Sequence, residues 1–120
     1  MGLNKIYDYR LDMLWEWVQK IPCGKVTSYG MLGQVFSPRL SGFIIGKWMA
    51  LASDSIPWWR VVGKNGEMLI HKRDPALAQR QREKLVKEGV QFVDGCIPLC
   101  YFWDPLSGNL LSFKQEDGAL

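Results

Sequence analysis

The chain has 120 residues, 48% of them apolar, which is enough for one domain around one packed core. The formal net charge is only +3, but eight basic and three acidic residues lie between Arg60 and Lys87. This local excess of positive charge favours contact with phosphates, whereas the segment from Asp104 is slightly acidic. The chain has one histidine and three cysteines without paired spacing, which argues against a zinc site and a disulfide framework. It has no run of 18 apolar residues and no signal-peptide pattern, which argues against a membrane span and secretion. We therefore expect a soluble cytoplasmic protein.

The first predicted element is a helix from Asn4 to Lys20. Its apolar side chains recur at the spacing of one helical face. They are Leu11, Leu14, Trp15 and Val18. Pro22 and Gly24 are expected to end this helix.

Two short helices are predicted next. Thr27 or Ser28 can cap a helix from Tyr29 to Val35. The dipeptide Ser37-Pro38, a cap residue followed by proline, predicts the start of a third helix that runs from about Arg39 to Leu51. Two short helices joined by a tight turn are typical of a helix-turn-helix.

An apolar run from Ile56 to Val62 contains two adjacent tryptophans and reads as a buried strand or strand-like turn. The turn sequence Gly63-Lys64-Asn65-Gly66 bounds it. Residues Glu67 to Ile70 could return as a second strand and form a wing. The bland interpretation of the tryptophans is that both are core residues.

The dipeptide Asp74-Pro75 predicts a helix over 76–88, stopped by Gly89 at the C′ position. Its inward side chains should be Ala78, Leu85 and Val86. The irregular segment 92–103 is expected to be anchored by Leu99, Tyr101 and Trp103. We therefore predict a mainly α fold with a small β wing, a winged helix-turn-helix domain over 1–103, followed by an extension over 104–120 that is either docked or loose.

Four segments, in this order, resemble one known family. They are 21–30 (IPCGKVTSYG), 38–42 (PRLSG), 57–61 (PWWRV) and 88–92 (EGVQF). Together they resemble the DNA-binding domain of the O6-alkylguanine-DNA alkyltransferases, over about 6–103. The resemblance implies a domain that binds duplex DNA through its minor groove and rotates a nucleotide out of the helix.

The departure from that family is as informative as the match. Its reactive motif reads Pro-Cys-His-Arg-Val, and this chain has Trp58 and Trp59 in place of the cysteine and the histidine. A thiolate accepts the alkyl group in the enzyme, whereas the nitrogen lone pair of an indole belongs to the ring. The chain thus resembles the alkyltransferase-like proteins, which carry this tryptophan and bind alkylated DNA without repairing it.

The resemblance also implies roles for residues of the helix-turn-helix. Tyr29 would press on the phosphate beside the lesion, and Arg39 would fill the gap left by the flipped base. As a cation at a predicted helix start, Arg39 breaks a local electrostatic rule. Ser41 and Gly42 would let the following helix approach the DNA closely. The alternatives are a Tyr29 packed on the first helix, an Arg39 paired with a carboxylate, and glycines that serve helix packing.

The lesion pocket implied by the resemblance contains Trp58, Val61 and Arg73, with Lys72 as the alternative to Arg73. The flat indole of Trp58 would form its floor. Arg60 is expected to be structural. Glu88, which completes a catalytic relay in the enzyme, would be left as a structural remnant.

We therefore expect a non-enzymatic sensor of O6-alkylguanine that marks the lesion for nucleotide excision repair proteins, acts as a monomer and uses no cofactor. The alternative is a winged-helix transcriptional regulator that reads sequence in the major groove. The apolar run Phe43-Ile44-Ile45 on the third helix argues against that alternative. An active alkyltransferase would need another thiol, and the three cysteines match no reactive position of the motif.

Overall fold

The structure is a computed structural model that describes residues 8–69 and 74–111. The helices are α1 (Arg10–Gln19), α2 (Tyr29–Gly33), α3 (Gly42–Met49) and α4 (Pro75–Lys87), with short 3₁₀ turns η1 (Trp58–Arg60) and η3 (Leu99–Tyr101). Two-residue strands are β1 (Thr27–Ser28), β2 (Val61–Val62), β3 (Trp103–Asp104) and β4 (Asn109–Leu110). The predicted fold class is confirmed: a mainly α winged helix-turn-helix domain with a small β component. No helix in the described ranges is long and apolar enough to cross a lipid bilayer.

Helix α1 begins at Arg10, later than the predicted start, and residues 1–7 lie outside the described part of the chain. The carboxylate of Asp8 accepts hydrogen bonds from the backbone N–H and the guanidinium of Arg10, which holds the chain at the helix entrance. Leu14 and Val18 are fully buried, as the helical spacing predicted. The amphipathic face of α1 therefore covers the core.

Helices α2 and α3 form the predicted helix-turn-helix. Of the two candidate caps for α2, Ser28 is the one used, because its hydroxyl accepts the N–H of Met31 at 3.1 Å. The helix ends at Gly33, two residues earlier than predicted. The connection folds back tightly, since Leu40 donates its N–H to the carbonyl of Gly33 at 3.0 Å.

The predicted start of α3 was wrong. The helix begins at Gly42 and ends at Met49, and its cap is Ser41, whose hydroxyl accepts the N–H of Ile44 at 3.2 Å. The backbone N–H of Leu40, directly after Arg39, closes the connection onto α2, and Ser37-Pro38 lies in that connection and starts no helix. Arg39 is thus outside the helix, and the conflict between its charge and the helix dipole does not arise.

Of the two interpretations of the run 56–62, the turn holds at the tryptophans and the strand only after them. Trp58 and Trp59 lie in the 3₁₀ turn η1, and only Val61–Val62 is a strand, paired in parallel with Thr27–Ser28. The side chain amide of Gln81 in α4 donates to the carbonyls of Trp59 and Val61 at 3.2 and 3.1 Å. Strand β1 and a side chain of α4 together therefore satisfy the backbone of this region.

The turn after β2 forms as predicted, with Gly66 at φ +83° and a hydrogen bond from the N–H of Gly63 to the carbonyl of Glu67. The chain turns back as a wing does, but residues 67–69 do not continue as the predicted strand. Ile70 lies outside the described residues. The side chain of Glu67 accepts the N–H of Asn65 instead, so the hydrogen bonds of this segment stay within the turn.

Helix α4 is capped by Asp74 and followed by Gly89 at φ +100°, as predicted. Ala78 and Leu85 are buried, but the expectation for Val86 was wrong, because its side chain is 53% exposed. Gln81 occupies the inner face in its place. The inward positions are thus i, i+3 and i+7, and Val86 lies next to that stripe.

The segment after α4 closes the domain. Phe102 is fully buried and Trp103 is 7% exposed, whereas Leu99, a predicted anchor, is 42% exposed and was misassigned. Val26 exchanges backbone hydrogen bonds with Tyr101 and Trp103, so this segment lies beside the start of β1. Strands β3 and β4 form an antiparallel hairpin.

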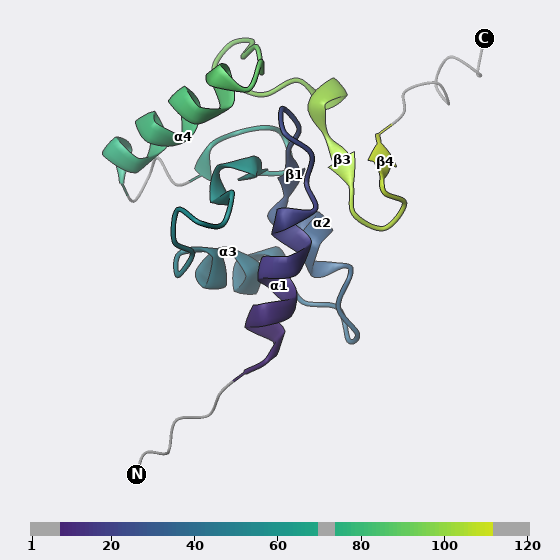
Figure 1. Ribbon diagram of the computed structural model, residues 1–120. Helices are drawn as coiled ribbons and strands as arrows, with labels where there is room; N and C mark the ends of the chain where they lie inside the picture. Colours follow the sequence, from purple (N-terminus) through teal and green to yellow (C-terminus); the bar gives the residue numbers. More distant parts are fainter. Residues whose placement is uncertain (1–7, 70–73, 112–120) are drawn as a thin grey trace, which may run out of the picture.

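The buried side chains form two clusters. One gathers α1, α2 and α3, and the other lies among Val26, Val62, Leu85 and Phe102. Trp59 packs against both. Figure 1 shows α1, α2 and α3 together, with α4 above them and the β3–β4 hairpin on the other side of β1. The turn η1 lies between the helix-turn-helix and α4, in contact with α4.

Candidate nucleic-acid interface and base pocket

A groove of about 920 Å³ runs between the helix-turn-helix and the turn after β2. Tyr29 at the start of α2 and Gly42 at the start of α3 line it, and Lys47 and Lys64 bring two positive charges to its rim. Phe43 lies there with 72% of its surface exposed and with the ammonium of Lys47 5.3 Å from its ring centre. The groove thus combines phosphate-binding groups with apolar contact area, as minor-groove binders do.

The small residues of α3 serve helix packing first. A side chain carbon at Gly42 would lie 3.2 Å from the backbone nitrogen of Gly30 and 3.5 Å from the Cβ of Tyr29. At Gly46 the nearest atom would be 3.9 Å away, on the ring of Tyr29. Gly42 is therefore required for the close approach of α2 and α3, whereas Gly46 leaves room for an alanine.

Arg39 and Ser41 lie on the connection between α2 and α3. Arg39 is exposed and pairs with no carboxylate among residues 8–69 and 74–111. Ser41 is committed to the cap of α3, which leaves its backbone at the exposed entrance of that helix. The alternative of a surface arginine held in an ion pair is thus not supported by the described residues.

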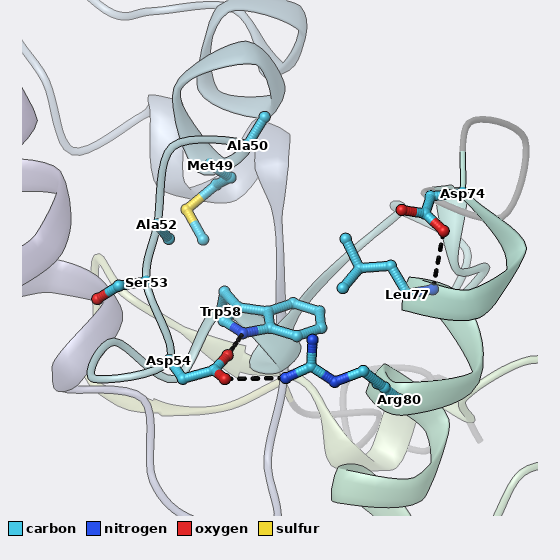
Figure 2. A pocket seen from close by; sticks show the side chains of 9 residues that line it. All are labelled: Met49, Ala50, Ala52, Ser53, Asp54, Trp58, Asp74, Leu77 and Arg80. Carbon is cyan, nitrogen blue, oxygen red and sulfur yellow. Dashed lines mark hydrogen bonds and ion pairs between the residues drawn. The ribbon is translucent and has the colours of Figure 1, made fainter.

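A second cavity, of about 530 Å³, opens between the end of α3 and the start of α4 (Figure 2). Its lining consists of Met49, Ala50, Ala52, Ser53, Asp54, Trp58, Asp74, Leu77 and Arg80. Trp58 is 8% exposed, and its ring faces the cavity between Asp54 and Arg80. The volume suits a ligand the size of a nucleobase with a substituent.

Two charged side chains fix Trp58. Its indole N–H donates to Oδ1 of Asp54 at 2.8 Å, and Oδ2 of Asp54 accepts from the guanidinium of Arg80 at 2.8 Å. The Cζ of Arg80 lies 5.9 Å from the centre of the Trp58 ring. The hydrogen bond from Trp58, followed by that from Arg80, lowers the pKa of the Asp54 carboxyl, which is therefore ionised at neutral pH.

Trp59 points to the other side of η1, edge-on to Trp58 with the ring centres 5.9 Å apart. Its indole N–H donates to Oε2 of Glu88 at 2.8 Å. Glu88 also accepts from the backbone N–H of Gly24 at 2.9 Å and from the guanidinium of Arg60 at 2.7 Å, and Arg60 donates in turn to the carbonyl of Ile21. Arg60 and Glu88 therefore have a structural role, as expected. Their hydrogen bonds join η1, the end of α4 and the turn at 21–24.

The pKa of Glu88 reflects this network. Burial raises it, but the hydrogen bonds from Arg60, Gly24 and Trp59 outweigh burial, so the pKa lies below its ordinary value. The carboxylate is ionised and accepts hydrogen bonds only. Glu88 therefore has no proton to relay in this environment.

The structure brings the predicted site residues into two places. Tyr29 and Gly42 line the groove, with Arg39 and Ser41 on the connection that leads into α3, and Trp58 lines the cavity. Val61 is 1% exposed and packs in the core, away from the cavity lining. Arg73 and Lys72 lie outside the described residues.

Two cavity residues were missed from the sequence, Asp54 and Arg80. Asp54 lies four residues before Trp58, a spacing without a known motif, and Arg80 reads as one of many cations on a solvated helix. The only sequence signal was the excess of positive charge over 60–87, which does not single out one arginine.

The helix-turn-helix, its groove and the adjoining cavity define a DNA-binding domain of the winged-helix class. The family described as "6-O-methylguanine DNA methyltransferase, DNA binding domain" matches residues 11–90. The chain therefore belongs to this family, as an alkyltransferase-like member.

Relatives and solved structures agree with this assignment. The "DNA base-flipping protein" of Escherichia coli K12 is 38% identical over 79 residues, which cover 64% of this chain and 59% of that protein. The chain thus spans about three-fifths of that relative, whereas the "DNA base-flipping protein" of Vibrio parahaemolyticus is 29% identical over 102 residues and is covered to 99%. Among solved structures, S. pombe Atl1 in complex with damaged DNA containing O6-carboxymethylguanine matches with TM-score 0.67 and 26% identity, over 82% of this chain and 98% of that chain. S. pombe ATL in complex with DNA matches with TM-score 0.68 and 27% identity, over 82% of this chain and 97% of that chain.

Proposed function

We propose that this protein binds O6-alkylguanine in duplex DNA, holds the flipped base in the cavity beside Trp58, and leaves the alkyl group in place. The printed names of the bacterial relatives, "DNA base-flipping protein", and the O6-carboxymethylguanine in the complex of S. pombe Atl1 support this proposal. The cavity of about 530 Å³ next to the helix-turn-helix can accommodate such a flipped base.

The observation that carries the proposal is the position of Trp58. In the motif of the family, a cysteine would stand where this indole lines the cavity, and none of the described lining residues is a cysteine. The ring offers a flat apolar wall, and its N–H is already bound to Asp54. Base–aromatic stacking of this kind contributes about 1–3 kcal/mol. Trp58 thus supplies binding energy and no nucleophile.

DNA would approach along the groove. In the proposal, α3 enters the minor groove, Tyr29 presses on the phosphate beside the lesion, and Arg39 enters the stack that the base has left. The exposed Arg39 and the groove position of Tyr29 support these roles. Lys47 and Lys64 would contribute the salt-dependent part of the affinity that is independent of the lesion.

A lesion that is held and left unrepaired needs a second activity to remove it. We therefore include in the proposal that the complex marks the site for nucleotide excision repair proteins, and that the protein acts in the cytoplasm as a monomer. For the marking role the support is chemical, because neither Trp58 nor Trp59 can accept an alkyl group and the carboxylate of Glu88 is held in hydrogen bonds. The winged-helix regulator is the weaker alternative, because α3 presents the exposed ring of Phe43 and the small residues Gly42 and Gly46 to the groove, where a major-groove reader would present polar side chains.

The test is transfer of label. The protein is incubated with duplex DNA that carries a radiolabelled O6-methyl group, and the polypeptide is isolated and counted. We expect label to stay on the DNA, and stoichiometric label on the polypeptide would end the proposal. Trp58→Cys is also expected to stay inactive, because the indole of Trp59 donates to Glu88 and cannot take a proton from the new thiol.

A further inference from the structure

The cavity contains a charged pair that stacking on Trp58 does not need. Asp54 and Arg80 both line it, and they face one another across a hydrogen bond of 2.8 Å (Figure 2). Their side chains are 61% and 48% exposed, so a base that enters the cavity can reach both. Such an exposed pair contributes little to stability. Holding Trp58 uses only part of the hydrogen-bonding capacity of the pair.

Both members have unused hydrogen-bonding capacity. Each oxygen of Asp54 accepts one bond, from Trp58 or from Arg80, and a carboxylate has about four acceptor positions in total. A guanidinium has five N–H groups, and the Nη2 of Arg80 uses one of them on Asp54. The pair therefore presents a free acceptor directly beside free donors.

The edge of guanine changes in the complementary way when O6 is alkylated. Unmodified guanine carries an N1–H donor next to the N2 amino group, so its edge presents two neighbouring donors. Alkylation of O6 removes the proton from N1, which becomes an acceptor, while the amino group remains a donor. An acceptor beside a donor on the base matches the donor of Arg80 beside the acceptor of Asp54.

We propose that Asp54 and Arg80 read this edge of the flipped base, with Asp54 accepting from the N2 amino group and Arg80 donating to N1. The inference rests on the proposed function and adds the residues that distinguish an alkylated guanine from guanine and from alkylated bases without the amino group. Unmodified guanine would turn its N1–H toward the donors of Arg80, which leaves both groups without a partner.

The remaining lining fits this orientation. Met49, Ala52 and Leu77 are apolar and line the cavity together with Trp58. They would give the alkyl group apolar contacts while the polar edge of the base faces the charged pair. The opposite charges of the pair also cancel, so the carboxylate adds no net repulsion toward the DNA phosphates. Charge cancellation explains how a carboxylate can serve at a DNA-binding site.

The test uses three duplexes in which the probe base stands opposite an abasic site, so that no base pair has to be broken before flipping. The probe bases are O6-methylguanine, guanine, and 6-methoxypurine, which has the methoxy group but no amino group. Dissociation constants are measured by fluorescence anisotropy for the wild type, Asp54→Ala and Arg80→Ala. Glu83→Ala serves as the control, because it removes an exposed carboxylate of α4 that does not line the cavity.

The wild type and Glu83→Ala are expected to bind O6-methylguanine about tenfold or more tightly than 6-methoxypurine, the effect of one hydrogen bond to a charged group. Asp54→Ala should bring that ratio close to one. Arg80→Ala should reduce the preference over guanine. Because each ratio compares two duplexes with the same protein, a general loss of folded protein cancels.

Two results separate this inference from the function on which it rests. If the wild type binds O6-methylguanine and guanine equally in ordinary paired duplexes, the proposed function itself fails. If the wild type prefers O6-methylguanine to guanine but binds 6-methoxypurine equally well, or if Asp54→Ala keeps the wild-type ratio, the reading by Asp54 is overturned and the function stands.

Discussion

The two sides of η1 contain the same chemical unit in different surroundings. On one side Asp54 accepts from the indole of Trp58 and from Arg80, and on the other Glu88 accepts from the indole of Trp59 and from Arg60. The side chains of Arg60 and Glu88 are 16% and 13% exposed, whereas those of Arg80 and Asp54 are 48% and 61% exposed. The buried unit holds the fold together, and the open unit is available to a ligand.

The comparison teaches how adjacent tryptophans divide two roles. Trp59 packs against both core clusters and joins η1 to α4 and to the turn at Gly24 through Glu88. This anchoring fixes the backbone from which Trp58 reaches the cavity. The buried unit thus acts as the support, and the open unit as the binding surface.

The largest expected effect comes from breaking the buried unit. Glu88→Ala should destabilise the protein by about 3 kcal/mol, because it removes the carboxylate from a largely buried ion pair with Arg60 and leaves the N–H groups of Gly24 and Trp59 without an acceptor. Asp54→Ala is the matched variant of the open unit and should change the free energy of unfolding much less, because the pair of Asp54 and Arg80 is largely exposed to solvent. Urea unfolding of both variants checks the comparison, and equal losses would show that burial does not separate the units.

The next effect is on binding. Trp58→Ala should bring the affinity for a duplex with O6-methylguanine closer to that for unmodified duplex by about 1–3 kcal/mol, the contribution of one base–aromatic contact. Affinity for unmodified DNA should persist, since the groove at Lys47 and Lys64 is untouched. Titrations at a fixed salt concentration measure the affinity for each duplex. An unchanged difference between the two affinities would show that Trp58 does not contact the flipped base.

Arg39→Ala should weaken lesion binding by about tenfold, with part of the loss specific to the lesion. The reason is its proposed place in the vacated stack, which exists only when a base is flipped. Lys64→Ala, at the rim of the groove, is the matched cation and should lower affinity for both duplexes equally. An equal loss in Arg39→Ala would make that arginine a phosphate contact only.

The smallest effect is on pH dependence. Because the fold lowers the pKa of Glu88, the folded protein binds fewer protons than the unfolded chain as this group titrates. Its stabilising contribution is complete above the unfolded pKa of glutamate, about 4.3, and is lost as pH falls below that value. Thermal unfolding of wild type and Glu88→Gln between neutral and acidic pH should show a steeper acid loss in the wild type. Parallel curves would contradict the assigned shift.

Local signals in the sequence predicted much of the fold. Asp74-Pro75 and Gly89 bound α4, Ser28 caps α2, and the apolar spacing of α1 selected Leu14 and Val18 for the core. These signals work because capping, proline geometry and helical periodicity depend on residues close in the chain.

The errors came from contacts between distant segments. The sequence left open whether Trp58-Trp59 forms a strand or a turn, because Gln81 supplies hydrogen bonds from α4 to the carbonyls of this region, which the local sequence does not reveal. The start of α3 was misplaced because Leu40 bonds back to Gly33. Asp54 and Arg80 are separated by 26 positions, and only the packing of α4 beside the end of α3 brings them together in one cavity.

The central claim is recognition of an alkylated base without its repair. One measurement tests it directly: titration of the protein with two duplexes that differ only in a single O6-methylguanine, followed by the mass of the recovered protein. The account predicts tighter binding of the lesion duplex and an unchanged protein mass. Equal affinity for the two duplexes, or a protein heavier by one methyl group, would contradict it.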